Sequence, residues 1–333
     1  MFPSSTQRKS WMYSDEKDII RLRETANHRF ISQHRKEMSD EDVGQYFLSA
    51  PEEAILIKRY EYHMREFCRR FSPPMPRTVT GTAFHYLKRF YVKNSVMDYH
   101  PKEILVTCVY LACKVEEFNV SIEQFVSNIK GDTSKASNII LNNELLLMQQ
   151  LNYNLTIHNP FRPVEGFIID LKTRSNLHNP DNLRPGIEDA LDQLFLTDAC
   201  LLYAPSQLAL AAVLHSARKS KENLDSYVTE TLLGPNSDKE LSDLIEIVRK
   251  IRSLLVKQPE QPPNNQVKLI EKKLEGCRNQ ENNPDSEIYK RKMQEMLDDE
   301  EEFQAKKYAK MLKEQARKEA KIVGISRISS PSA

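Results

Sequence analysis

Residues 105–117 read LVTCVYLACKVEE, an apolar stretch that ends abruptly in a lysine and two glutamates. At 3.6 residues per turn, apolar or small side chains cover every face of a helix here. Such a helix is enclosed by other helices, so the stretch predicts the centre of an all-α bundle. Lys114 lies near the helix C-terminus, where a cation interacts favourably with the helix dipole, whereas Glu116 and Glu117 oppose that dipole. From the residues alone, a buried helix whose end reaches solvent accounts for this cluster.

A second stretch repeats the first. HPKEILVTCVYLACK (100–114) aligns with APSQLALAAVLHSAR (204–218) at an offset of 104 residues, with proline on proline and Lys114 on Arg218. Two unrelated buried helices that each begin with proline would also give this match. The flanking segments repeat as well, however, so the sequence predicts two similar all-helical domains of about five helices each.

Helical periodicity extends over nearly the whole chain. An amphipathic helix is predicted at 14–30, followed by a polar, irregular stretch at 31–50. The helices predicted for the first domain are 52–71, 77–93, 101–117, 121–130 and 134–152. Those predicted for the second domain are 163–175, 185–203, 205–219, 222–233 and 238–256. Two further helices are predicted at 267–278 and 285–320.

These segments divide the chain into four predicted parts. Residues 1–51 form an N-terminal extension with a helix, and residues 52–157 form the first domain. Residues 158–257 form the second domain, which begins at the proline-containing HNPFRPVEG. Residues 258–333 are predicted to hold a linker, a charged helix and a disordered tail.

Composition narrows the possible functions. The 333 residues carry a net charge of +1, so no general excess of Lys and Arg suggests a nucleic-acid surface. Only 8 glycines are present, which disfavours Gly-rich phosphate loops. The five cysteines include no CxxC pair and are interpreted as free, buried thiols of a reducing compartment. The polar start and the absence of an apolar run of about 18 residues predict a soluble intracellular protein.

No constellation of catalytic residues stands out. No two histidines are four residues apart, and Walker A, GxSxG and protein-kinase motifs are absent. His63 and Cys68 could be proposed as base and nucleophile, but five residues apart on one helix they point to different faces. A surface histidine and a packed cysteine are the favoured interpretation. The sequence therefore predicts no enzyme, no metal and no cofactor.

The segment NNELLLMQQLNYNL (142–155) suggests a binding surface. Helical periodicity puts Glu144, Met148, Leu151 and Leu155 near one face. Glu144 is either an exposed residue at the rim of a core helix or part of a half-polar groove with Lys114. In the second interpretation, a foreign helix enters the groove, where apolar anchors supply affinity and the two charges fix register.

These motifs resemble those of a known family. LACKVEE and NELLLMQQLNYNL resemble the third and fifth helices of the cyclin box, and the two repeats match cyclin architecture. Longer stretches, MPRTVTGTAFHYLKRFYVKNSVMDYHPKEI, CKVEEFNVSIEQF and HNPFRPVEGFIIDLKTR, are similar to the cyclin H branch. The resemblance covers residues 5–256, whereas 267–333 match weakly. It implies two tandem five-helix cyclin boxes with extra N- and C-terminal helices.

The resemblance also implies a function. Proteins of this branch bind and activate a cyclin-dependent kinase within the CDK-activating kinase complex, for cell-cycle kinase activation and phosphorylation of the RNA polymerase II C-terminal domain. The implied partners are that kinase, a RING-finger assembly subunit and the transcription factor IIH complex in the nucleus, with no direct nucleic-acid or membrane contact. The implied kinase-binding residues are Lys114, Glu144, Val115, Met148, Tyr153 and Leu155. The N-terminal helix, with Trp11 and Tyr13, is expected to pack on the repeats.

The chain departs from cell-cycle cyclins at MREFC (64–68), where Glu66 replaces a small residue of the substrate-docking patch. Substrate recruitment through that patch is therefore disfavoured. Ser5 and Ser330 are possible phosphorylation sites. Two alternatives remain: another transcriptional cyclin, and the DNA-gripping core of a general transcription factor with the same fold. The latter normally needs a basic face and a zinc ribbon, which the near-neutral charge and the absence of CxxC oppose.

Overall fold

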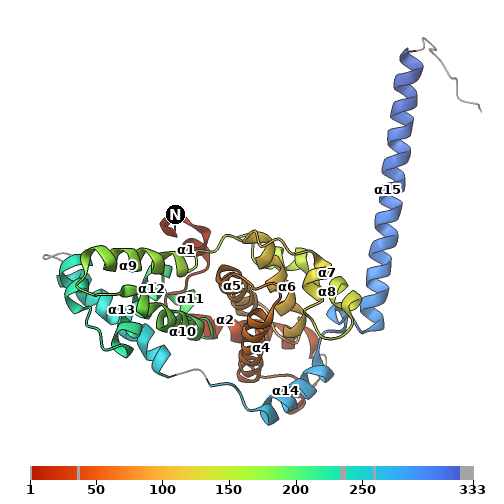
Figure 1. Cartoon of the computed structure of the whole chain (residues 1–333). Coiled ribbons are helices and arrows are strands. Elements are labelled where there is room, and N and C mark those ends of the chain that lie inside the picture. Colours follow the sequence, from red (N-terminus) through yellow and green to blue (C-terminus); the bar gives the residue numbers. More distant parts are fainter. Residues whose placement is uncertain (1, 36–37, 233–237, 258–259, 323–333) are drawn as a thin grey trace, which may run out of the picture. The chain divides into compact units, whose positions relative to one another are not determined.

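The computed structural model describes residues 2–35, 38–232, 238–257 and 260–322. The chain forms two compact units, Met1–Arg278 and Asn279–Ala333. Every regular element of the described residues is helical, which confirms the predicted all-α class (Figure 1). None of the described helices has the length and apolar character needed to span a membrane.

The larger unit contains two helical bundles with flanking helices. The N-terminal elements are η1 (Phe2–Ser4), α1 (Thr6–Ser10), α2 (Glu16–His34) and α3 (Asp40–Tyr46). The first bundle consists of α4 (Ala50–Arg70), α5 (Arg77–Lys93), α6 (Pro101–Val115), α7 (Ile122–Val126) and α8 (Thr133–Gln150). The second bundle consists of α9 (Phe161–Arg174), η2 (Pro180–Leu183), α10 (Arg184–Phe195), α11 (Ala199–Leu202), α12 (Pro205–Lys219), the π-helix η3 (Tyr227–Leu232) and α13 (Asp238–Val256).

Helix α14 (Asn264–Cys277) completes the larger unit by packing against α3 and α4 of the first bundle. Its buried side chains Val267, Ile270 and Leu274 follow helical spacing, which explains the contact. The smaller unit holds η4 (Gln280–Asn282) and the 36-residue helix α15 (Glu287–Ile322). Its charged side chains form pairs along the helix, such as Lys306 with Glu302 at 2.6 Å.

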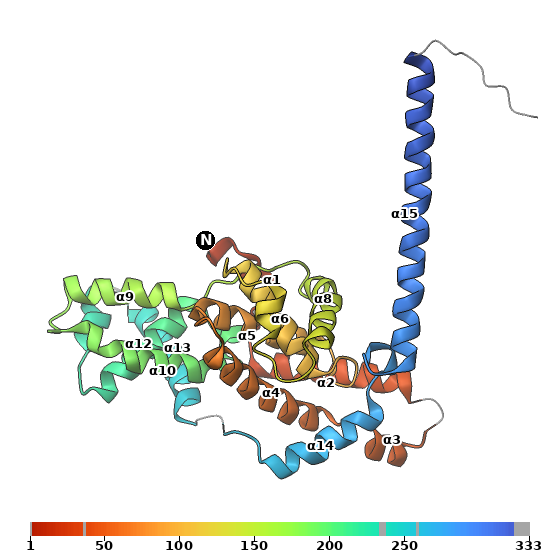
Figure 2. The same ribbon diagram turned by 45° about the vertical axis from the view of Figure 1, so that its right-hand side comes forward.

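The two bundles repeat one another, as predicted from the sequence. Helix α6 contacts α4, α5 and α8, and α12 contacts α9, α10 and α13 in the same way (Figures 1 and 2). The offset of 104 residues holds beyond the stretch that first suggested it, since α4 and α9 end at Arg70 and Arg174. Cys108 of α6 and Ala212 of α12, which are 104 residues apart, have no exposed surface, which confirms that these helices form the centres of the two bundles.

The N-terminal segment packs on both bundles, as expected. Trp11 is 1% exposed and lies beneath two cations of α5, with its ring 4.4 Å from Lys93 Nζ and 5.1 Å from the Arg89 guanidinium. The backbone N–H of Tyr13 donates to the carbonyl of Leu201 in the second bundle, at 2.9 Å. Helix α2 then packs along α5.

The expectation of an irregular stretch at 31–50 was wrong. Helix α2 continues to His34, and α3 follows after Ser39, whose hydroxyl accepts from the N–H of Asp42. The acidic first turn of α3 suits the positive end of the helix dipole. Phe47 and Leu48 are buried and fix this segment to the core. The N-cap serine and the acidic residues after it were a usable sequence signal.

Two expectations for the second bundle also required correction. The helix predicted at 185–203 is interrupted between Phe195 and Ala199, because the Thr197 hydroxyl donates to the Leu194 carbonyl and accepts from the Ala199 N–H. This local competition ends α10 and starts α11. The helix predicted at 222–233 is replaced by the short π-helix η3.

All five cysteines are buried and free, as predicted. Burial raises the pKa of Cys68 to about 12, so this thiol stays protonated at neutral pH. His63 on the same helix is exposed whereas Cys68 is buried, so the two side chains occupy different faces and do not form a catalytic pair.

The buried carboxyl of Glu53 on α4 gives the fold a pH dependence. Burial raises its pKa from 4.5 to about 7, and hydrogen bonds from Ser95 and Asn27 offset this only in part. The folded state therefore binds more protons than the unfolded state between these values, so stability falls as pH rises through the window. We expect Glu53→Gln to gain about 2–3 kcal/mol relative to the unsubstituted chain between pH 5 and 8 in urea unfolding. Parallel pH profiles for the two chains would contradict this.

Candidate functional site

The charged end of α6 has a defined geometry. Glu117 has a φ of 56°, and the N–H of Phe118 donates to the Cys113 carbonyl at 2.9 Å. The Glu117 N–H also donates to the Lys114 carbonyl at 3.3 Å, which completes a Schellman motif. The carboxylate of Glu116 turns inward and accepts from the Thr82 hydroxyl of α5 at 2.6 Å. The helix can therefore end in a group of charged residues, because Glu116 bonds to Thr82 and Glu117 takes the left-handed conformation that ends the helix.

Lys114 and Glu144 lie side by side, although 30 positions separate them. Lys114 Nζ is 2.6 Å from Oε1 and 2.8 Å from Oε2 of Glu144 on α8. The ammonium also lies 4.8 Å from the centre of the Tyr110 ring, one turn earlier on α6. The Lys114 side chain is 46% exposed and that of Glu144 is 16% exposed, so the pair forms part of the surface.

An apolar surface continues from this pair along α8. Met148, Leu155 and Val115 are half-buried, and Tyr153 is 60% exposed. Leu151, which helical periodicity grouped with Glu144, is fully buried and belongs to the core instead.

The sequence analysis missed two leucines of this surface. Leu141 and Leu145 are 47% and 54% exposed and flank Glu144 on α8. With Met148 they follow a spacing of four and three residues, which places all three on one face. The sequence did contain a signal for them: this helix has more leucines than a single buried face can hold, so some of them must lie at the surface. We call the surface formed by Lys114, Glu144, Leu141, Leu145 and Met148 the first notch.

The backbone beside the first notch is held in place by α5. Helix α8 is followed by a turn in which Asn152 and Tyr153 have φ values of 52° and 55°, and this turn carries the Tyr153 side chain into solvent. The Tyr86 hydroxyl donates to the Leu155 carbonyl at 2.6 Å, and Arg89 donates to the Asn154 carbonyl at 3.1 Å. Such fixed geometry favours binding because little ordering remains for a partner to impose.

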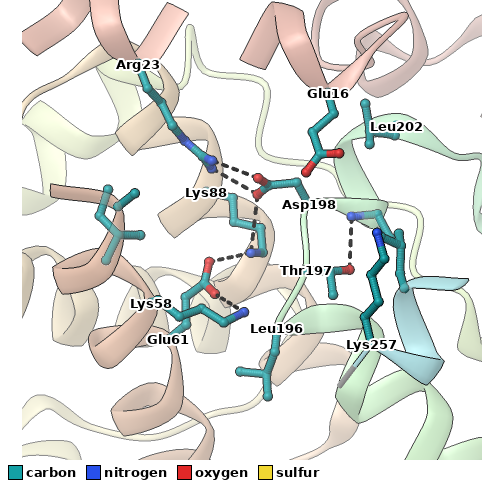
Figure 3. A pocket seen from close by; sticks show the side chains of 14 residues that line it. Glu16, Arg23, Lys58, Glu61, Lys88, Leu196, Thr197, Asp198, Leu202 and Lys257 are labelled. Carbon is teal, nitrogen blue, oxygen red and sulfur yellow. Dashed lines mark hydrogen bonds and ion pairs between the residues drawn. The ribbon is translucent and has the colours of Figure 1, made fainter. Parts of the chain in front are cut away.

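The junction of the two bundles is held by a buried ionic network, which Figure 3 shows around a cavity of about 260 Å³. Arg23 of α2 binds both carboxylate oxygens of Asp198, at 2.7 and 2.9 Å. Lys88 of α5 donates to Glu61 of α4 and lies 3.5 Å from Asp198. Lys58 completes the network, 3.4 Å from Glu61.

The charges of this network stabilise one another. Burial alone would raise the pKa of Asp198, but Arg23 and Lys88 hold it well below its usual value. Burial alone would lower the pKa of Lys88, but Glu61 and Asp198 raise it. Asp198 and Lys88 are therefore both charged at neutral pH, and each already has partners inside the network, which is typical of structural ion pairs.

Other residues singled out from the sequence lie elsewhere. Glu66 is partly exposed among arginines, with Arg69 at 3.5 Å and Arg70 at 3.5 Å. The Ser5 hydroxyl accepts from the Arg8 N–H at 3.3 Å and thereby caps α1. Ser330 lies outside the described residues.

The described residues do not gather the side chains of a metal centre, since no three of their His, Cys, Asp or Glu groups converge. What the first notch offers is a rigid surface with apolar anchors and one ion pair at its edge. Surfaces of this kind bind an amphipathic segment of another protein.

Both bundles match described families. Residues 54–156 match "Cyclin, N-terminal domain", and residues 159–256 match "Cyclin C-terminal domain". The chain is 43% identical to Cyclin-H of Xenopus laevis over 84% of its own length and 88% of that protein.

Two solved structures resemble the fold. One is a chain of the CAK complex from Chaetomium thermophilum bound to ATP-gamma-S, with a TM-score of 0.70, 23% identity and coverage of 83% of this chain and 88% of that one. The other is a chain of the yeast TFIIK complex, with a TM-score of 0.60, 25% identity and coverage of 75% and 98%.

Proposed function

This chain belongs to the cyclin family and within it to the cyclin H proteins, and from this premise we propose that it is the regulatory subunit of a CDK-activating kinase. In this role it binds and activates a cyclin-dependent kinase and is not itself an enzyme. The activated kinase acts on other cell-cycle kinases and on the C-terminal domain of RNA polymerase II, in the nucleus. The names of the two structural neighbours, a CAK complex and TFIIK, support this assignment.

The observation that carries the proposal is the ion pair of Lys114 and Glu144 beside the exposed leucines of α8. We propose that these two residues contact the kinase, as the resemblance to cyclins implies. We propose that Val115, Met148, Tyr153 and Leu155 contribute further contacts, and we add Leu141 and Leu145 because of their exposure.

Activation follows from binding only one conformation of the kinase. A kinase needs its β3 lysine paired with the glutamate of its αC helix, and an isolated cyclin-dependent kinase holds that helix misplaced. A rigid surface that accepts only the inward position shifts the equilibrium toward it. A shift from 1% to 99% active takes about 5.5 kcal/mol of differential binding, which an interface of roughly 1,600 Å² can supply.

The assembly and domain limits belong to the same proposal. We propose that a RING-finger assembly subunit and the transcription factor IIH complex join the pair, with no direct contact to nucleic acid. We also propose box limits of 52–157 and 158–257, which the matched segments 54–156 and 159–256 support.

Reconstitution tests the function directly. The purified full chain is mixed with the catalytic subunit of a CDK-activating kinase, and phosphate transfer is measured to a cyclin-dependent kinase and to RNA polymerase II C-terminal repeats. We expect a stable complex and transfer to both substrates only when the chain is present. Failure to form a complex at micromolar concentrations would contradict the proposal, whereas DNA binding that weakens steeply with salt would favour the transcription-factor alternative.

A further inference from the structure

The second bundle carries a counterpart of the first notch. The offset of 104 residues places Arg218 at the position of Lys114 and the start of α12 at that of α6. The cap geometry is also the same, because Lys221 has a φ of 59° and the Glu222 N–H donates to the Ala217 carbonyl at 2.9 Å. The backbone of the second bundle therefore presents its cation as the first bundle does.

The side chains on the facing helix, however, are different. At the same offset, α13 has Val248 at the position of Glu144, Arg252 at that of Met148 and Ile245 at that of Leu141. The second bundle thus lacks the carboxylate that neutralises the cation of the first. Among the described residues, no carboxylate forms an ion pair with Arg218, Arg249 or Arg252, whereas Lys250 of the same helix pairs with Glu246.

An open apolar groove of about 740 Å³ lies between α12 and α13 at this place. Leu210 and Val248 lie at its floor, and Ile245 is 44% exposed at its edge. Arg218, Arg249 and Arg252 also line it, together with one acidic residue, Asp225, which lies two residues before η3. Burial, with a further contribution from the charge of Arg218, lowers the pKa of Arg252, as expected for cations that share a rim.

We propose that this groove is a second docking site, which takes an amphipathic helix of a partner protein whose apolar stripe is flanked by carboxylates. The apolar residues of that helix fill the space between α12 and α13, as in helix-in-groove recognition. Its carboxylates take the place that Glu144 holds in the first bundle and pair with Arg218 and Arg252. The site selects an acidic helix over a basic one, because like charges at the rim cost several kcal/mol.

The test uses the full chain and two designed helical peptides of about 18 residues, or five turns. Both peptides carry leucines at i, i+3, i+4 and i+7, flanked by glutamates in one and by lysines in the other. Binding is measured by fluorescence anisotropy at about 0.1 M salt, where exposed charges still interact over roughly 10 Å. The variants are Arg252→Glu and Ile245→Asp. The matched control is Leu141→Asp, which changes the equivalent position of the first notch.

We expect saturable binding of the glutamate peptide and binding of the lysine peptide that is at least about tenfold weaker. Arg252→Glu should reverse this preference, and Ile245→Asp should weaken both peptides by about tenfold or more. Leu141→Asp should leave peptide binding unchanged. Equal binding of the two peptides, no saturable binding, or a loss caused by Leu141→Asp instead of Ile245→Asp would overturn the proposal.

Measuring the affinity for the kinase distinguishes a failure of this docking site from a failure of the proposed function. Ile245→Asp lies in the second bundle and should leave the affinity for the kinase within about twofold, as expected for surfaces that share no residue. If Ile245→Asp no longer binds the kinase, the groove belongs to the kinase interface, and the proposal of a separate docking site is overturned. Loss of peptide binding with the kinase retained supports the proposal even if the identity of the kinase is revised.

Discussion

The charge-exchanged variant Lys114→Glu/Glu144→Lys is expected to bind the kinase at least about 30-fold more weakly than the unsubstituted chain, which corresponds to 2 kcal/mol or more. The exchange retains an ion pair between α6 and α8, because the two side chains lie 2.6 Å apart and trade only their signs. Local stability should therefore change by less than about 1 kcal/mol, as for other surface pairs. What changes is the pattern of charge that the partner meets.

Binding of the kinase is measured by calorimetry or by retention on immobilised kinase, with circular dichroism to check that the helices persist. Lys114→Ala/Glu144→Ala provides a second test in which both charges are absent, and this variant should also fail to bind the kinase. As a control, Arg77→Glu/Glu188→Arg exchanges a surface pair of similar geometry, at 2.7 Å, that lies outside the first notch. If the exchanged Lys114 and Glu144 variant binds as tightly as this control, the first notch is not the kinase surface.

Part of the first notch could be predicted from local patterns in the sequence. Helical periodicity and the resemblance to cyclins placed Lys114 and Glu144 together, and the structure does so. The bounds of α5 and α13 were also predicted correctly. Each of these inferences rests on residues within one helix or on a repeat that is visible in the sequence.

Other features depend on packing that a single helix does not reveal. Leu151 and Leu145 both continue the apolar pattern of α8, but only the neighbouring helices decide that one is fully buried and the other 54% exposed. Arg23 and Asp198 are 175 positions apart and meet because α2 crosses to the second bundle. Long-range pairing of this kind has no periodic signature in the sequence.

The second large effect is expected from Lys88→Met, which should lower the free energy of unfolding by about 3–5 kcal/mol. The Lys88 side chain is 1% exposed, and its ammonium serves both Glu61 and Asp198. Methionine matches the stem of the lysine side chain as far as Cε, but it leaves these two carboxylates with one fewer cation in a region of low dielectric constant. Arg23 and Lys58 still contact them, so the loss is that of one ion and not of the whole network.

A matched change at the surface isolates burial as the cause. Arg77→Met removes one partner of the Arg77–Glu188 pair, which also joins the two bundles but is about half exposed. Its expected cost is about 1 kcal/mol or less, because water replaces the missing partner. Urea unfolding of both variants gives the comparison, provided that the dependence of the free energy on urea stays constant.

The double variant Lys88→Met/Glu61→Met decides between loss of packing and loss of charge balance. If unpaired charge is the cause, removing Glu61 as well should restore about 2 kcal/mol or more, since Glu61 is then no longer a buried carboxylate without its cation on α5, and Asp198 keeps Arg23. If packing around the long lysine stem were the cause, the second substitution would add its own cost and the double variant would be less stable still. Recovery in the double variant would therefore show that the junction of the two boxes depends on balanced charge, whereas a further loss would contradict that account.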